Sequence, residues 1–304
     1  EEPIKVDGLL NEPAWQKAPE ANDFIQFQPE RGKPASLKTV VKILYDKDFI
    51  YFGFHCYDNQ PEKIVASITK RDSDIQIDDS VRILIDTFHD RRSCYYFETN
   101  LLGTQLDGRI TENGRTEDET WDGIWKSAGQ RTEFGWSAEI AIELSSLKYE
   151  PGTATTWGLS LGRRVPRILE SSFWTGPLES EYKVSQFGVL KGLDLPKSEK
   201  KSQVIPHIIS KAEEKKETGL EAGLDARYAF SQMISSNLTI NPDFATVEAD
   251  QERINLTRFE LNLPEKRNFF LEGSEIYSQR IRLFYSRRIS DIYGGVKLYG
   301  KSGG

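Results

Sequence analysis

The sequence has very little of the residues that hold transition metals. Its 304 residues include 2 cysteines, 3 histidines and 1 methionine. A zinc site built on several cysteine or histidine ligands is therefore nearly excluded. The chain also lacks the metalloprotease HExxH motif, the GxSxG nucleophile elbow, the P-loop and the Rossmann glycine fingerprint, so nothing indicates the catalytic classes that depend on them. No run of about 18 apolar residues occurs, and we expect no transmembrane helix.

Positive charge is also in short supply. The chain carries 40 basic and 47 acidic side chains, a net charge of −7, and we predict no nucleic-acid partner. The 38% hydrophobic and 29% charged residues indicate a globular chain, and the length suggests about two domains. Cys56 and Cys94 both lie in expected strands; we favour two buried free thiols, with a disulfide as the open alternative.

Aromatic and β-branched residues are abundant, and they occur in short segments bounded by Gly, Pro, Asp and Asn. This pattern is typical of an all-β chain. The clearest predicted strands are 39–45 and 49–57, joined by a tight turn at 46–48. Further strands are predicted at 81–88, 94–100, 124–130, 135–142, 157–164 and 187–190, with one helical turn at 143–149. Such short strands with frequent turns predict a β-sandwich.

The pattern changes after about residue 192. Residues 192–203 are rich in Lys, Ser, Glu and Pro, which indicates a linker. Residues 220–230 then alternate between apolar and more polar positions, over a length that suffices for a tilted membrane-spanning strand. An ordinary amphipathic hairpin, with 233–241 as its second strand, is the alternative. Strand-like alternation resumes at 281–286 and 295–299.

Two groups of residues are candidates for binding. Trp121 and Trp125 lie on either side of Gly123, and Trp174 lies in loop-like sequence. Indole rings at such places can stack on sugar faces; core packing is the alternative, expected for at least half of the 6 tryptophans. A dense acidic segment suggests calcium, which prefers oxygen ligands, although it lacks the EF-hand spacing and a solvated loop would also explain it. The calcium candidates are Asp74, Asp78 and Asp79.

Five stretches resemble the family 9 carbohydrate-binding modules. Residues 6–15 (VDGLLNEPAW) resemble the opening V-D-G-x-x-D-E-x-x-W, and the other matches follow in order at 44–51, 79–86 (DSVRILID), 135–142 and 186–188. The resemblance covers about residues 1–192. It implies a β-sandwich in a secreted or periplasmic protein associated with polysaccharide breakdown, with a glycan or small saccharide as partner.

The chain departs from that family at its sugar site. Sugar-binding members enclose the ring between two tryptophans, and this chain has roughly Gln76 and Glu181 in those places. Those members also use an acid on one strand and an arginine on the next, whereas here the positions hold Arg82 and Glu98. The two charges have exchanged strands, so an ion pair can survive while the polarity of the site is inverted. We therefore expect a different ligand or a different pose.

The second half resembles an uncharacterised family, domain of unknown function 5916. The similarity lies in residues 241–250 (NPDFATVEAD) and 264–273 (PEKRNFFLEG). It implies an outer-membrane β-barrel that this chain only begins. It also suggests a location at the periplasmic side of the outer membrane, a start at Glu1 left by removal of a signal peptide, and an end at Gly304 that interrupts the barrel.

These observations predict an all-β protein. Residues 1–192 form a carbohydrate-binding-module-like sandwich, 193–203 a linker, and 204–304 an incomplete β-hairpin or barrel segment. The predicted function is non-catalytic glycan recognition, with Trp121, Trp125, Trp174, Arg82 and Glu98 as candidate sugar contacts. The alternatives are a glycoside hydrolase acting through paired carboxylates, and a structural or protein-docking sandwich without sugar binding.

Overall fold

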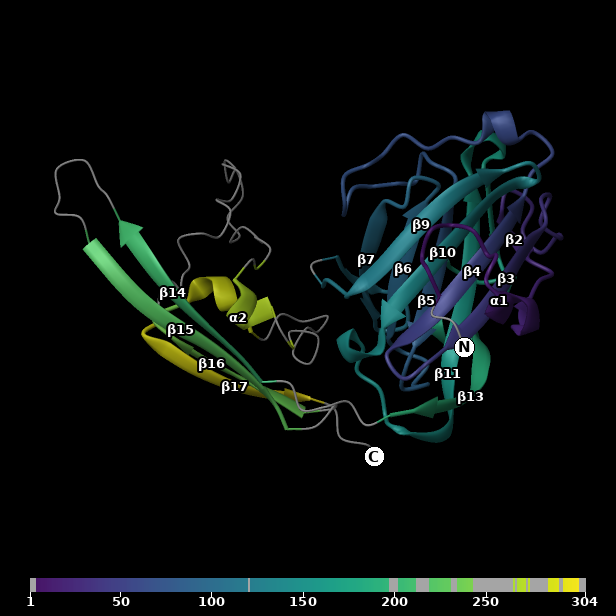
Figure 1. Cartoon of the computed structure of the whole chain (residues 1–304). Helices are drawn as coiled ribbons and strands as arrows, with labels where there is room; N and C mark the ends of the chain where they lie inside the picture. The colour runs from purple at the N-terminus through teal and green to yellow at the C-terminus, as the bar shows by residue number, and fades with distance from the viewer. Residues whose placement is uncertain are drawn as a thin grey trace. The chain divides into compact units, whose positions relative to one another are not determined.

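The computed structural model describes residues 4–119, 121–196, 202–211, 219–230, 234–242, 265, 267–271, 273, 284–289 and 292–300 (Figure 1). The chain divides into two compact units, Glu1–Lys197 and Ser198–Gly304. Antiparallel strands make up nearly all of the regular structure in the described residues, which confirms the all-β prediction. None of the helices in these residues is long and apolar enough to cross a membrane.

The smaller sheet of the first unit has five strands in the order β1-β3-β4-β10-β9. The strands are β1 (Glu20–Ala21), β3 (Thr39–Tyr45), β4 (Phe49–Tyr57), β10 (Gly135–Glu143) and β9 (Trp125–Thr132). In the turn between β3 and β4, the Asp46 carboxylate accepts hydrogen bonds from the backbone N–H groups of Asp48 and Phe49. An aspartate that holds its own turn in this way fixes the register of the hairpin, which is why the sequence predicted both strands correctly.

The larger sheet has eight strands, seven of them in the order β2-β12-β11-β5-β6-β7-β8, with β13 also paired to β11. The strands are β2 (Ile25–Gln28), β12 (Glu170–Phe173), β11 (Gly152–Val165), β5 (Ser80–Asp86), β6 (Cys94–Asn100), β7 (Gln105–Thr111), β8 (Thr116–Asp118) and β13 (Gly188–Leu195). Side chains alternate between the two faces of each strand. Even-numbered residues of β5 and β11 therefore lie on the face opposite to the odd-numbered ones.

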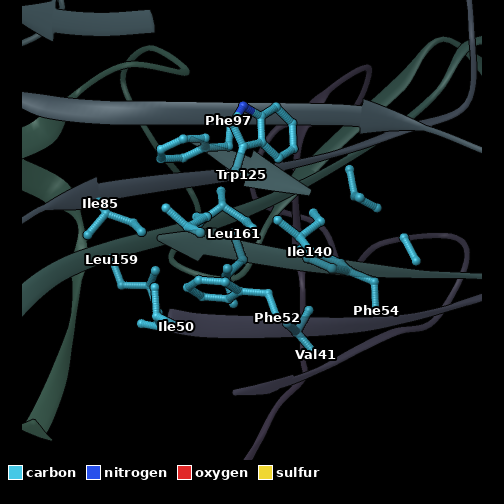
Figure 2. Packing of buried hydrophobic residues seen from close by; sticks show 14 of the residues in the cluster. Val41, Ile50, Phe52, Phe54, Ile85, Phe97, Trp125, Ile140, Leu159 and Leu161 are labelled. Atoms are coloured by element: carbon cyan, nitrogen blue, oxygen red, sulfur yellow. The ribbon is translucent and has the colours of Figure 1, made fainter. Parts of the chain in front are cut away.

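The main core lies between the two sheets (Figure 2). The smaller sheet contributes Phe52, Phe54 and Ile140, and the larger sheet contributes Ile83 and Leu161, all essentially inaccessible to water. Burial of such large apolar side chains stabilises each by roughly 1.5–3 kcal/mol relative to exposure. This shared core makes the first unit a β-sandwich.

The outer face of the larger sheet is also covered. The segment between β12 and β13, residues 174–187, inserts Leu178 and Val184 into a second cluster with Leu84, Tyr96 and Phe173. Leu178 and Val184 are fully buried. We call residues 174–187 the cover segment; its two apolar anchors fix it against the sheet on either side of Glu181.

The outer face of the smaller sheet is closed by the N-terminal segment, which includes α1 (Pro13–Lys17). The Glu139 carboxylate on β10 accepts hydrogen bonds from the backbone N–H groups of Asp7 and Gly8, at 2.8 and 2.9 Å. It also accepts one from the Trp15 indole N–H, at 2.9 Å. Burial raises the pKa of Glu139 above its ordinary value, although these hydrogen bonds oppose the shift.

The second unit contains a four-stranded sheet in the order β14-β15-β16-β17. The strands are β14 (Ser202–Lys211), β15 (Gly219–Ala229), β16 (Ile234–Ile240) and β17 (Gly294–Gly300), accompanied by the short helix α2 (Asn268–Leu271). Val204, Ala226, Leu238 and Val296 lie opposite one another across the four strands. This row places apolar side chains on one face of the sheet from edge to edge.

Several expectations need correction. The predicted linker 193–203 is strand at both ends, because β13 continues to Leu195 and β14 begins at Ser202. The strands β7, β8 and β12 were not predicted. Of the predicted strand 281–286, residues 281–283 lie outside the described residues, and a short 3₁₀ helix at Ser286–Arg288 follows where strand was expected. Cys56 and Cys94 are free and buried in two different clusters, as predicted.

Leu161 lies at the centre of the main core, and its truncation should be costly. We expect Leu161→Ala to lower the free energy of unfolding by about 2–5 kcal/mol, because it removes buried contacts and leaves a cavity. The control is Leu102→Ala, the same change at a side chain that is 52% exposed, which should cost less than about 1 kcal/mol. Urea denaturation followed by tryptophan fluorescence measures both. Equal losses in the two variants would contradict this assignment of the core.

Candidate functional site

Four strands of the larger sheet bring polar side chains together on its outer face. Arg82 on β5 lies opposite Glu98 on β6 and Gly162 on β11. Arg164 on β11 lies opposite Ser80 on β5 and Ser171 on β12. Because these positions share one face, the register alone assembles two guanidinium groups, one carboxylate and two hydroxyl groups in a single patch.

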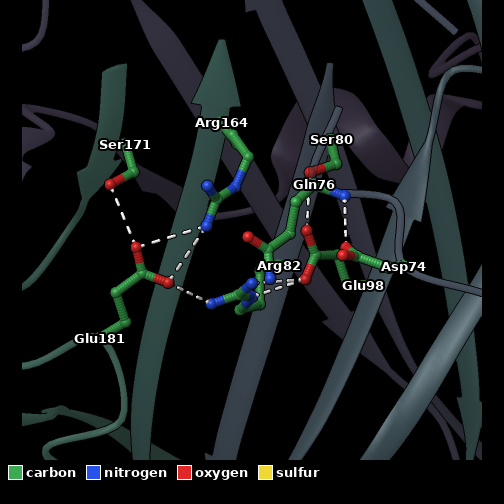
Figure 3. Close-up of polar contacts among 8 residues, drawn as sticks. All are labelled: Asp74, Gln76, Ser80, Arg82, Glu98, Arg164, Ser171 and Glu181. Atoms are coloured by element: carbon green, nitrogen blue, oxygen red, sulfur yellow. Dashed lines mark hydrogen bonds and ion pairs between the residues drawn. The ribbon is translucent and has the colours of Figure 1, made fainter. Parts of the chain in front are cut away.

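Arg82 and Glu98 form the central ion pair (Figure 3). Nε and Nη2 of Arg82 lie 2.8 and 2.6 Å from Oε2 of Glu98. The hydroxyl of Ser80 donates to the other oxygen of Glu98, at 2.7 Å. Both charged groups are buried, so each requires the other. The ion pair expected from the exchanged charges is therefore present.

Glu181 joins this pair from the cover segment. Its Oε2 accepts a hydrogen bond of 2.7 Å from Nη1 of Arg82, and Nη2 of Arg164 lies 3.3 Å from the same oxygen (Figure 3). The Ser171 hydroxyl donates to Oε1 at 3.2 Å. Glu181 thus links both arginines.

The charges of this group determine its electrostatics. Burial alone would lower the pKa of Arg82, but the charges of Glu98, Tyr182 and Glu181 outweigh it and raise the pKa further above the ordinary value. Arg82 is therefore a permanent cation. Its guanidinium carbon also lies 5.2 Å from the centre of the Tyr182 ring, in a cation–π contact.

A small hollow remains beside these side chains. Its lining includes Ser80, Arg82, Glu98, Arg164, Ser171 and Glu181, and we call it the Arg82 pocket. The free volume is about 10 Å³, which is room for one water molecule. Glu98 lies deepest, whereas the side chains of Arg164 and Glu181 are 22% and 17% exposed and form the mouth.

A family model for carbohydrate family 9 binding domain-like proteins matches residues 6–162, which is just over half of the chain. The chain belongs to this family. Its N-terminal unit is a carbohydrate-binding module. A second family model, domain of unknown function 5916, matches residues 203–297. No curated protein matches the chain.

Solved structures with similarity to this family 9 chain include a module from Caldicellulosiruptor kristjanssonii in complex with cellotriose. At 17% identity and a TM-score of 0.43, the match covers 63% of this chain and 89% of the other. A structure of a family 9 module from the same organism in complex with glucose matches with the same identity and TM-score and is covered to 91%.

The predicted stacking tryptophans are not assembled into a site in this family 9 module. Trp125 is 5% exposed and belongs to the main core, where its ring packs on Phe97 (Figure 2). Trp121 and Trp174 are partly buried against the same core, and the Trp121 ring centre lies 4.7 Å from that of Tyr95. Trp125 therefore follows the core-packing alternative, because its side chain faces inward at the start of β9.

The predicted calcium ligands serve the loop that carries them. The buried carboxylate of Asp78 accepts hydrogen bonds from the backbone N–H groups of Ser67 and Ile68. Asp79 and Asp74 likewise accept from the backbone N–H groups of Val65 and Gln76. The structure does not gather Asp74, Asp78 and Asp79 into one group.

A different set of three carboxylates does converge among the described residues. Asp72, Asp107 and Asp122 each place an oxygen within 4.8 Å of the others. Arg71 supplies the positive charge there, with Nη2 at 2.7 Å from Asp107 and 3.1 Å from Asp122. The group is therefore already neutralised in part by a side chain of the protein.

Sequence reasoning found Arg82 and Glu98 but missed Arg164 and Ser171 as members of the site. Glu181 was noted only as a replacement for a tryptophan. An available signal was the alternation of β11, which places Arg164 two residues beyond the position opposite Arg82 and hence on the same face.

Asp107 should make stability depend on pH. Burial raises the pKa of Asp107 from its ordinary value of 3.8 to about 6, against the opposing effects of the Gly123 N–H and Arg71. The folded state then binds a proton more tightly than the unfolded chain, so this contribution is present below about pH 4 and is lost as the pH rises to about 6. Asp107→Asn should remove a decline of about 3 kcal/mol, measured by urea denaturation from pH 3.5 to 7. An unchanged decline in the variant would show that another group causes it.

Proposed function

We propose that the sandwich binds a saccharide at the Arg82 pocket. The observation that supports this site is the convergence of two guanidinium groups, two carboxylates and two hydroxyl groups on one hollow that opens to solvent. Charged groups that are already fixed by mutual ion pairs can exchange hydrogen bonds with sugar hydroxyl groups without further ordering. Arg164, Ser171 and Glu181, which lie nearest the mouth, would make the first contacts.

The two alternatives have less support. A glycosidase needs one carboxyl group to deliver a proton and a second to act as nucleophile or base. Glu98 and Glu181 are both engaged in ion pairs with Arg82, which leaves neither free for that chemistry. The core position of Trp125 favours a protein-docking sandwich over stacking on sugar. The polar pocket favours a saccharide, and a direct titration separates the two functions.

Arg164 provides the test of saccharide binding. We expect Arg164→Ala to weaken binding of glucose or cellotriose at least tenfold, because a charge-assisted donor at the mouth is lost. Lys126→Ala, which removes an exposed cation from β9 in the other sheet, should leave the affinity unchanged. Isothermal titration calorimetry at millimolar protein measures both. Absence of heat with a broad saccharide panel would refute the proposed function.

We further propose that the sheet of the second unit contacts lipid, at the outer membrane of an exported protein. One face carries exposed apolar side chains on every strand, including Val204, Ile208, Tyr228, Ile240, Val296 and Leu298. Exposed apolar patches of this kind mark interaction or membrane surfaces.

The opposite face of that sheet is polar and partly covered. Asn237 and Thr239 are buried there, and the Thr239 hydroxyl donates to Asp225 at 2.5 Å. The Lys297 ammonium donates to the backbone oxygen of Phe269 in α2. A sheet that buries its polar face and exposes its apolar one has the pattern of a lipid-facing transmembrane sheet.

Leu298 tests this second proposal. We expect Leu298→Arg to reduce binding to vesicles of phosphatidylethanolamine and phosphatidylglycerol, because a charge on a lipid-facing strand costs up to about 2–4 kcal/mol. Leu169→Arg is the matched control, since Leu169 is 78% exposed in the sandwich unit. Vesicle flotation of the full chain reports the bound fraction. Equal flotation of the two variants, or none for the unmodified chain, would count against lipid contact.

A further inference from the structure

The Arg82 pocket divides into a part carried on strands and a part carried on the cover segment. Arg82, Glu98, Arg164 and Ser171 belong to four neighbouring strands whose register is fixed by the sheet. Glu181 alone comes from the cover segment. The strand-borne part holds two cations and one anion, so it has an excess of one positive charge that Glu181 neutralises.

The donors within the strand-borne part are not equivalent. The Glu98 carboxylate binds Nε and Nη2 of Arg82 through one oxygen and accepts a hydrogen bond from the Ser80 hydroxyl at the other. Nη1 of Arg82, Nη2 of Arg164 and the hydroxyl of Ser171 all point to one further carboxylate, that of Glu181 (Figure 3). These three donors form a receptor for a single carboxylate group, which the chain fills with its own side chain.

From this arrangement we infer that the Arg82 pocket recognises an acidic saccharide, whose uronic acid carboxylate takes the place of Glu181 between Arg82 and Arg164. The inference rests on the proposed saccharide binding and adds the class of sugar. A neutral sugar that displaced Glu181 would leave a partly buried guanidinium group without an anion, which is costly. A ligand carboxylate replaces both the charge and the hydrogen bonds, so the exchange loses neither.

The geometry of the mouth fits such an exchange. The free volume beside Glu181 holds one water molecule, so a sugar carboxylate reaches the arginines only when the Glu181 side chain leaves. That side chain lies at the solvent edge. Leu178 and Val184 anchor the cover segment on both sides of it, so the side chain can swing out while the segment stays in place.

The test compares charged and neutral ligands of equal shape on the full chain. Calorimetric titration with galacturonate and with its methyl ester isolates the contribution of the carboxylate. We expect the acid to bind at least tenfold more tightly than the ester, and less tightly as salt increases. The comparison needs no variant, so it holds even where a substitution disturbs folding.

Substitution of Glu181 provides the second arm. In Glu181→Gln the competing carboxylate is gone, and we expect affinity for galacturonate to rise about tenfold while affinity for the methyl ester and for galactose rises by less, because only the acid also restores the missing anion. Glu179→Gln removes an exposed carboxylate of the same segment, paired with Lys183, and should change neither affinity.

The possible outcomes separate the two proposals. Equal binding of the acid and its ester, or no gain in Glu181→Gln, overturns the acidic ligand and leaves saccharide binding intact. Binding of acetate as tight as that of galacturonate shows an anion hole without sugar recognition and also overturns it. If no saccharide binds to any of the proteins, both proposals fail.

Discussion

The buried guanidinium group of Arg82 is the constraint around which the outer face of the larger sheet is organised. A cation removed from water requires anions within hydrogen-bonding distance, and it obtains one from the neighbouring strand and one from the cover segment. The need of Arg82 for these anions determines the orientation of the Glu98 and Glu181 side chains and how closely the cover segment approaches the sheet. Ser80 and Ser171 complete the group by donating to Glu98 and Glu181.

The same constraint explains how little open space the pocket has. In a sandwich, the outer face of a sheet is normally left to solvent or to a ligand. Here the cover segment buries Leu178 and Val184 on that face and leaves Glu181 between them at the solvent edge. Recognition at this face therefore depends on exchanging charged partners, since the apolar surface on which a sugar ring could stack is already used by the protein.

Sequence patterns predicted the parts of the fold that are determined locally. Strands β3, β4 and β6 were predicted at their observed bounds, because their hydrophobic residues are framed by turn-forming aspartates, arginines or glycines. Strand β14 was not predicted: the expected linker ended at residue 203, and the rest of this strand contains Pro206. Its pairing with β15 supplies the order that composition did not reveal.

The site was predictable only where it depends on the register of two adjacent strands. The Arg82–Glu98 pair follows from two adjacent strands whose partners were recognisable. Glu181 lies 99 residues from Arg82 in the chain, and no local sequence pattern predicts the contact between them. The inward direction of Trp125 was not predictable for a related reason: the sequence places it at the start of a strand, but the face that its side chain occupies depends on pairing with the distant strand β10.

The Glu139 carboxylate connects two motifs of the family that are far apart in the sequence. The N-terminal stretch VDGLLNEPAW and the strand GWSAEIAI lie more than a hundred residues apart, yet Glu139 accepts hydrogen bonds from the N–H groups of Asp7, Gly8 and Trp15 in the first. The two motifs therefore form a single contact in the folded domain. A fragment that began after Trp15 would lose these three donors together with the segment that covers this face of the sheet, so the boundary of a self-sufficient domain must lie before residue 7.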